Sequence, residues 1–525
     1  MLFMPNKDLS SLYRDITKDR GKPLDFWEVT ALLEVYGIRD IDAQKDYGFD
    51  DVFAMAKYMM QYTDIKNYPV KSLVNFEKVP AFRIRIFKNY FRGLAFAMPM
   101  FVQIFFTLSI GYAIWSGIDM DQMKATVIAV GTFLALIVTG ASAQAIGRKG
   151  LFYLKQGEVI LASNITRVLL NVGYVFVVIV GILLIFLNMF FEIFPTYYFF
   201  IMISFYFLLS LLFLNISIYY MFEEYNNILY FFILGIIFVY IAHTFFQVQL
   251  PEAQFLALIF LDAIISFLAY KKLRDLKKKD VKSEGEGLPR ASILFYSLIP
   301  FYLYGFLYFL FLVTDRLVAW SANIESKPYF IWFNVPYELG LDWALIALVL
   351  LMGLTEISIH EFMYRINDTV MKYQYKMFNE FNKEIYTFFK KFNIAYAIFS
   401  IFVILLTYFV MYFINLHGNY EFTKDFFKSF TPAVYWTSAI SYAFMVNGLM
   451  NILFIFSFSR QNFSVKAISI ATIVNLLVGV ILSRMFGLEF AVVGLLVGSV
   501  VFWTYSFIYT LQMLKKLEFY YYSSF

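Results

Sequence analysis

Cysteine is absent from this chain of 525 residues, and histidine occurs only as His243, His360 and His417. The lack of cysteine excludes disulfide frameworks, thiolate metal sites and cysteine nucleophiles. Three histidines so far apart along the chain argue against a histidine-built metal centre. We therefore predict that the protein has no metal site and no cofactor.

Charge is also scarce, because only 15% of the residues are Asp, Glu, Lys or Arg. The 43 basic and 38 acidic side chains nearly balance, which gives no compositional support for a nucleic-acid partner. In contrast, 61% of the residues are hydrophobic and 21% are aromatic. A soluble core cannot bury so many apolar side chains, so the composition predicts an integral membrane protein in contact with a lipid bilayer.

Apolar runs long enough to cross a bilayer recur along the chain, since each membrane helix needs about 20 consecutive, mostly apolar residues. The expected spans are 93–117, 124–146, 168–190, 195–221, 226–247, 253–270, 292–313, 341–359, 393–415, 432–457, 466–487 and 489–513. The predicted fold class is an all-α membrane protein with about twelve transmembrane helices.

The basic residues lie almost entirely on one side of this arrangement. If residues 1–92 and every second loop are cytoplasmic, all but six of the 43 Lys and Arg residues face the cytoplasm. The six exceptions are Lys124, Arg316, Lys327, Lys424, Lys428 and Arg484. By the positive-inside rule, we expect both termini in the cytoplasm. Residues 1–77 contain no continuous apolar segment, so we expect no signal peptide.

The longest basic linker, residues 271–291, follows the sixth span and separates two sets of six spans. We predict a cytoplasmic helical module (1–85), an N-terminal lobe (86–270) and a C-terminal lobe (292–525). A flexible, charged linker between equal halves is typical of transporters whose lobes move against each other. Within the module, apolar residues spaced by three and four predict helices, and Asp50 is the expected cap of the second.

Polar and aromatic residues gather just beyond the seventh span. Asp315 and Arg316 come first, and Trp320, Trp332 and Tyr337 follow. Proteins hold sugars with aromatic faces and a few hydrogen-bonding groups, so these five residues are candidate substrate or gate residues on the outer side. The alternative is that the rings mark the membrane interface and that the Asp-Arg pair closes a salt bridge between the lobes.

Four further residues are candidates for function. Arg148, at the start of the first cytoplasmic loop, is a candidate contact for an anionic lipid or saccharide, with anchoring of a helix end as the alternative. Asp262 lies deep in the sixth span, and Glu356 and His360 share one face near the end of the eighth. Ionisable groups are costly inside a membrane, so these three are ion-coupling candidates. The alternatives are an interhelical hydrogen bond and a solvated helix end.

Three stretches of the sequence point to one known family. The residues concerned are Thr139, Gly140 and Arg148, then Asp315, Arg316, Trp320, Tyr337, Glu338, Glu356, Glu361 and Tyr364, and last the terminal KKLEFYYYSSF. Together they resemble the Pel exopolysaccharide exporter family (PelG-like) of the multidrug/oligosaccharidyl-lipid/polysaccharide (MOP) flippase superfamily. The resemblance implies export of a polysaccharide across the bacterial inner membrane by alternating access of two lobes. It also implies a cytoplasmic glycosyltransferase and small membrane subunits as partners.

Other functions remain open from the residues alone. A lipid-linked oligosaccharide flippase and a multidrug antiporter of the same superfamily share the expected architecture. A membrane glycosyltransferase is a further alternative, because Asp119 and Asp121 lie in the first external loop, where such enzymes carry acidic metal ligands. That loop is too short to cover a sugar acceptor, so we predict that the chain is not an enzyme.

Overall fold

The chain is described from a computed structural model. The structure describes residues 9–17, 23, 26–62, 81–118, 120–156, 158–279, 291–322, 329–372, 378–417, 426–427 and 429–523. In these residues every regular element is a helix, and the only extended pairing is an isolated bridge between Tyr112 and Gly117. The predicted all-α class is therefore confirmed. The chain divides into two compact units, Met1–Arg85 and Ile86–Phe525.

The first unit is built from short helices around a small apolar core. Its elements are α1 (Leu9–Thr17), α2 (Phe26–Val35), α3 (Asp40–Asp42), η1 (Ala43–Tyr47) and α4 (Val52–Tyr62). Leu33 of α2 and Met55 of α4 are fully buried in that core. The prediction for the cap of α4 was wrong by one residue: Asp51 rather than Asp50 is the cap, because its Oδ1 accepts the Ala54 amide at 2.6 Å.

The second unit contains the long helices. They are α5 (Phe82–Ile110), α6 (Gln122–Lys155), α7 (Val159–Phe191), α8 (Thr196–Met221), α9 (Tyr225–Tyr240) with η3 (Ile241–Phe245), α10 (Leu250–Lys279), α11 (Ala291–Trp320), α12 (Val335–Lys372), α13 (Phe378–His417), α15 (Thr431–Ser457), α16 (Gln461–Met485), η5 (Leu488–Phe490), α17 (Ala491–Leu514) and α18 (Leu517–Tyr522). Among the described residues, twelve helices are long and apolar enough to cross a membrane, as predicted.

Several boundaries differ from the expected ones, including those of α5 and α10. The first span was placed at 93–117, but α5 begins at Phe82 and ends at Ile110, because helical residues continue beyond the apolar stretch at its start. The linker predicted for 271–291 is helical over its first nine residues, since α10 continues to Lys279. The rest of that linker, 280–290, lies outside the described residues.

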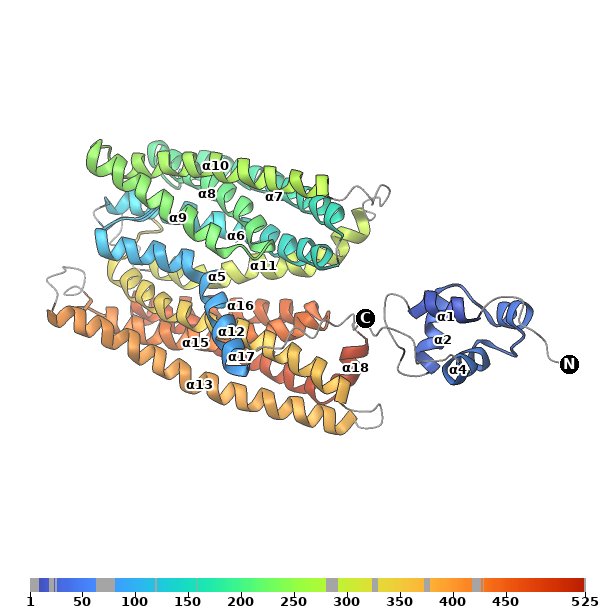
Figure 1. The fold of residues 1–525 in the computed structure, drawn as a ribbon. Coiled ribbons are helices and arrows are strands. Elements are labelled where there is room, and N and C mark those ends of the chain that lie inside the picture. The colour runs from blue at the N-terminus through green and yellow to red at the C-terminus, as the bar shows by residue number, and fades with distance from the viewer. Residues whose placement is uncertain are drawn as a thin grey trace. The chain divides into compact units, whose positions relative to one another are not determined.

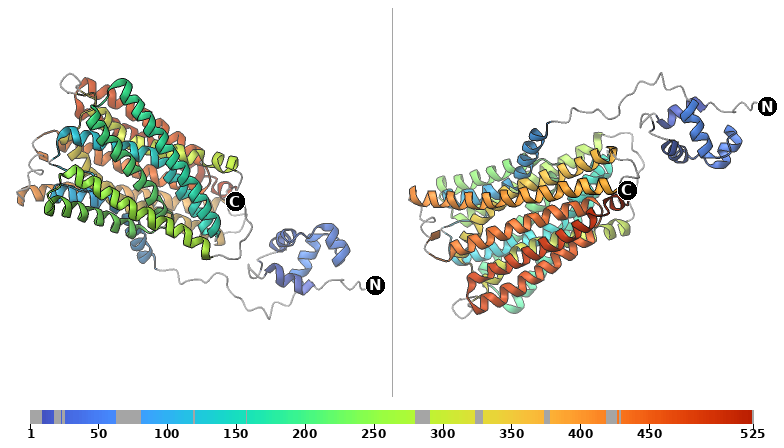
Figure 2. Two further views of the ribbon diagram at one scale, coloured as in Figure 1. Left: turned by 90° about the horizontal axis from the view of Figure 1, so that it is seen from above. Right: turned by 90° about the horizontal axis from the view of Figure 1, so that it is seen from below.

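The long helices run alongside one another in two groups (Figures 1 and 2). Helices α6 to α10 form one group, in which α6 packs on α7 and α8, and α12 to α17 form the other, in which α15 packs on α12 and α17. Helix α11 lies between them and packs against both α6 and α16. Following the order of the chain, we count α5 with the first group and α11 with the second. We call the end of the unit that holds Arg92 and Lys155 the basic end, and the end that holds Trp320 and Val335 the far end.

The two groups meet where glycine lets backbones approach closely. A side-chain carbon added at Gly305 of α11 would overlap the carbonyl oxygen of Gly140 of α6. A second crossing joins α5 to α12, where a carbon added at Gly93 would lie 2.9 Å from Cα of Gly353. Small residues allow this because membrane helices associate through close packing rather than through a hydrophobic driving force.

We expect Gly305→Ala to destabilise the membrane unit. The added methyl group cannot be placed without moving one backbone, and such overpacking costs about 1–3 kcal/mol. The measurement is the thermal unfolding temperature of the purified protein in detergent. Gly147→Ala on α6 is the matched control, because nothing lies within 4 Å of the added carbon. Equal unfolding temperatures for the two variants would show that the crossing is not tight.

Candidate functional site

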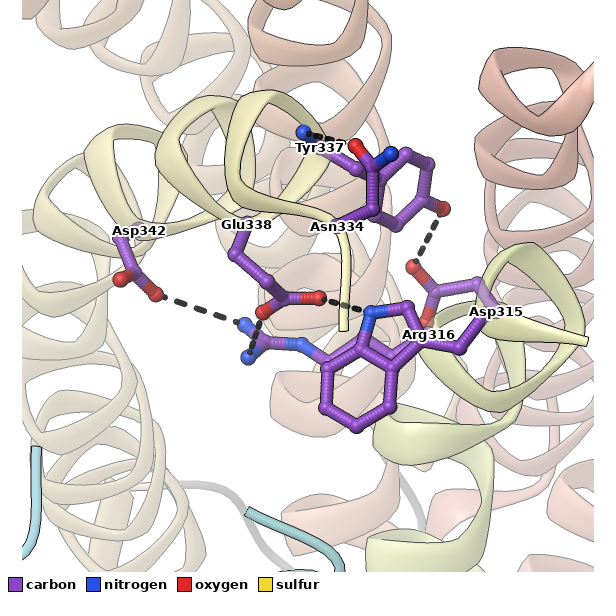
Figure 3. Close-up of polar contacts among 7 residues, drawn as sticks. Asp315, Arg316, Asn334, Tyr337, Glu338 and Asp342 are labelled. Carbon is purple, nitrogen blue, oxygen red and sulfur yellow. Dashed lines mark hydrogen bonds and ion pairs between the residues drawn. The ribbon is translucent and has the colours of Figure 1, made fainter. Parts of the chain in front are cut away.

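The charged residues of the predicted outer site meet where α11 ends and α12 begins (Figure 3). Nη1 of Arg316, in the last turn of α11, lies 2.6 Å from Oε2 of Glu338 on α12. Nη2 of the same guanidinium lies 3.7 Å from Oδ1 of Asp342, one helical turn further along. Glu338 and Asp342 are four residues apart and therefore share the helix face that meets Arg316.

Neighbouring groups hold these charges in place. Oε1 of Glu338 accepts a hydrogen bond from Nε1 of Trp320 at 2.9 Å. The hydroxyl of Tyr337 donates to Oδ2 of Asp315 at 3.1 Å, whereas Oδ1 of Asp315 is buried and has no hydrogen-bond partner among the described residues. Asn334 caps α12 by accepting the Tyr337 amide at 3.0 Å. Two carboxylates thus contact one guanidinium, and the carboxylate of Asp315 lies on the adjoining residue of the same helix end.

The cluster is shielded from water. The side chains of Arg316 and Glu338 are only 12% and 6% exposed. Removing ions from water costs several kcal/mol each, which a close, hydrogen-bonded pair offsets. Arg316 also lies over the ring of Phe133 on α6, at 5.7 Å from the centroid. The charged cluster of the second group is therefore closed off by a helix of the first.

Neutral contacts join the two groups at the same end. The Phe333 amide donates to Oγ1 of Thr126 at 3.1 Å, and Nε2 of Gln122 donates to the Phe333 carbonyl at 2.5 Å. Both partners lie in the first turns of α6. The ring of Trp320 lies 5.3 Å from that of Phe133. These contacts close the far end between α6 and the segment that links α11 to α12.

The three aromatic candidates differ in exposure. Trp320 and Tyr337 are completely buried, so neither presents a ring face to a ligand in this conformation. Trp332 is half-buried, stacks on Tyr329 with centroids 6.2 Å apart, and donates its amide to the Trp320 carbonyl at 3.1 Å. The hypothesis that these rings contact a sugar stays a prediction, and Trp332 is the ring placed best for it.

The placement of Arg148 was wrong. It does not begin a loop, because α6 continues to Lys155. Its guanidinium lies 5.6 Å from the ring centroid of Phe301 on α11, and Nη2 donates to the Phe456 carbonyl on α15 at 3.5 Å. Arg148 therefore joins the two groups toward the basic end.

Glu356 and His360 lie on α12 toward the same end. Nε2 of His360 is 3.2 Å from Oε2 of Glu356, as the spacing of four predicts. Glu356 interacts electrostatically with Arg92 of α5, which forms an ion pair with Glu223 between α8 and α9. Lys155 of α6 is 3.7 Å from the same Glu223. Charges from both groups thus converge beside the Gly93–Gly353 crossing.

Asp262 is buried inside the first group. The residue is 4% exposed, and neither carboxylate oxygen has a hydrogen-bond partner in the described structure. Polar side chains from the first group of helices form a hydrogen-bond network: Tyr174 donates to Oδ1 of Asn215 at 2.8 Å, and Nδ2 of Asn215 donates to Ser266 at 2.9 Å. Asp262 interacts electrostatically with Tyr174, so the carboxyl lies beside this network.

Several residues of these sites were not predicted. Glu338 was noted only as part of a family pattern, although its spacing of four from Asp342 signals a shared face. Arg484 of α16 caps α11 by donating to the Val318 carbonyl at 3.3 Å and to Ser321 at 2.9 Å. Of the acidic pair considered for a glycosyltransferase, Asp119 lies outside the described residues. No group of three metal-ligating side chains occurs in the part of the chain that the structure describes.

Comparison with known proteins gives similarity in fold alone. No family model and no curated protein sequence matches the chain. Among solved structures, a MATE transporter of Vibrio cholerae, VcmN, matches with a TM-score of 0.57 and 11% identity over 83% of this chain and 98% of its own. A MATE protein in the straight conformation matches with a TM-score of 0.56 and 12% identity, over 83% of this chain and 96% of its own. An inward-facing multidrug resistance MATE family transporter of the MOP superfamily matches with a TM-score of 0.50 and 12% identity, over 81% of this chain and 98% of its own.

The chain therefore has the fold of MATE transporters, which belong to the MOP superfamily. This agrees with the predicted all-α membrane fold.

Arg316→Met should destabilise the membrane unit by about 3–5 kcal/mol, because it leaves Glu338 buried without its cation. The double variant Arg316→Met, Glu338→Gln should recover part of the loss, since the amide still accepts from Trp320. Thermal unfolding of the purified variants measures both effects.

Lys155→Met is the matched control for that experiment. Its pair with Glu223 has side chains 64% and 33% exposed, so its loss should cost less than about 1 kcal/mol. If Arg316→Met loses no more stability than Lys155→Met, the structural role of the buried cluster is contradicted.

Proposed function

We propose that this chain is a secondary transporter that exports a polysaccharide across the bacterial inner membrane by alternating access of its two groups of helices. The observation that carries the proposal is the MATE-like fold over 83% of the chain. The contacts between the groups support it, because they include single hydrogen bonds and ring contacts that separate at modest cost. The resemblance to the Pel exporter family supports a sugar polymer as the substrate.

The direction of export follows from the proposed orientation. All but six of the basic residues lie in segments that we assign to the cytoplasm, including the basic end of the bundle. The Trp332 segment is then the exit side. A cytoplasmic glycosyltransferase and small membrane subunits are the partners that the family resemblance supports.

Two buried sites are proposed to couple transport to a cation gradient. Asp262 offers two free carboxylate oxygens beside the Asn215 network, so it can take up a proton or a small cation without breaking an existing hydrogen bond. In the second group, Glu338 and Asp342 share a single guanidinium, so a proton or cation bound there changes the attraction that holds α11 to α12. Buried carboxylates that interact in this way are typical of proton and ion pathways.

Multidrug antiport is the second candidate function. It is favoured by one of the matched structures, which is named as a multidrug resistance transporter. The two functions differ in a simple assay: the polymer exporter restores polysaccharide secretion to cells that lack it, whereas the antiporter raises drug resistance in cells that lack drug pumps.

Asp262→Asn should abolish export while leaving the fold intact, because the amide has the same shape but cannot exchange a proton. The measurement is secreted polysaccharide, together with the unfolding temperature of the purified variant. Glu252→Gln, exposed at the start of the same helix, is the matched control and should secrete normally. Normal secretion by Asp262→Asn would rule out this carboxyl as the coupling site.

A further inference from the structure

A groove opens at the basic end of the first group, where α8, α9 and α10 come together. Its volume is about 700 Å³, within the range of about 300–1,000 Å³ common for ligand sites. Tyr230 of α9 and Leu268, Lys271 and Asp275 of α10 line it. The apolar run of α10 ends at Tyr270 and is followed by Lys271 and Lys272, so the groove lies where the hydrocarbon core gives way to the headgroup layer.

The apolar side of the groove faces the bilayer. The side chain of Tyr230 is 64% exposed and that of Leu268 is 37% exposed. Exposed apolar residues continue along α9 from Tyr230 through Leu234 and Ile237, which lie four and seven positions on and so share one face. An acyl chain can follow this stripe into the bilayer from the groove.

The polar side of the groove offers one cation and one anion. Lys272 forms an ion pair with Glu224, so these two charges neutralise each other within the protein. The Lys272 ammonium also lies 4.5 Å from the ring centroid of Phe222. Lys271 and Asp275, one helical turn apart, form no ion pair with each other or with another described residue. They leave a positive and a negative group side by side at headgroup depth.

We propose that this groove binds a phospholipid whose headgroup carries a primary ammonium next to its phosphate, as in phosphatidylethanolamine. The Lys271 ammonium pairs with the phosphate, and the Asp275 carboxylate accepts hydrogen bonds from the lipid ammonium. Phosphatidylglycerol has a phosphate for Lys271 but no ammonium for Asp275, so the Asp275 carboxylate would lie beside a negatively charged headgroup. Phosphatidylcholine has no N–H to donate to Asp275.

The test uses the full chain in nanodiscs of equal parts phosphatidylethanolamine, phosphatidylglycerol and phosphatidylcholine, with retained lipids counted by native mass spectrometry. The wild-type chain should retain phosphatidylethanolamine about fivefold over phosphatidylcholine, the effect of roughly one hydrogen bond from the lipid ammonium to Asp275, since both lipids carry the phosphate. Lys271→Ala should lower the retention of all three lipids, because each loses its phosphate contact. Asp275→Asn should shift the preference to phosphatidylglycerol, because the remaining Lys271 then selects for negative charge.

Lys383→Ala is the matched control, since Lys383 lines a separate groove between α12 and α13. It should leave the lipid ratios unchanged. The proposal is overturned if the wild-type chain retains the three lipids equally, or if Lys271→Ala retains phosphatidylethanolamine as well as the wild type does. Lys271 is exposed, so its removal is not expected to affect folding, and an unchanged unfolding temperature verifies this.

Discussion

Arg316 is a guanidinium buried in an apolar bundle, and the need to neutralise it joins α11 to α12. A separated charge at this depth would cost several kcal/mol, so Glu338 has to stay within hydrogen-bonding distance. The other oxygen of Glu338 binds Trp320, and Arg484 caps the end of α11 from α16. The far ends of α11, α12 and α16 are therefore tied together by charge and are expected to move as one body.

At the far end, the contacts between the two groups are of a different kind. Gln122 and Thr126 each contribute one hydrogen bond to Phe333, and the crossings at Gly305 and Gly93, away from that end, are close but apolar. A hydrogen bond of this kind contributes about 1 kcal/mol net. Opening between the groups at the far end is therefore cheaper than opening within the second group. This ordering of energies is what alternating access requires, since each group has to stay intact while the space between them changes.

The sequence alone was sufficient to predict the helix class, the number of spans and the burial of Asp262, because the hydrocarbon core imposes a length and an apolar composition on every crossing. Helix ends were harder: α13 begins at Phe378, well before the apolar run expected from 393, since amphipathic residues extend it outside the bilayer. The pairing of Arg316 with Glu338 was not predicted. It joins residues 22 apart on two helices, and one sequence does not specify which faces of two helices meet.

The distance between the two groups at the far end is the most direct test of this account. The chain has no cysteine, so Gln122→Cys and Phe333→Cys would carry the only two spin labels. In proteoliposomes studied by double electron–electron resonance at several pH values and sodium concentrations, we predict a short and a longer distance whose populations change with conditions. A control pair within the second group, Phe333→Cys and Met485→Cys, should keep one distance. A single, unchanging distance between the labels at 122 and 333 would contradict movement of the two groups.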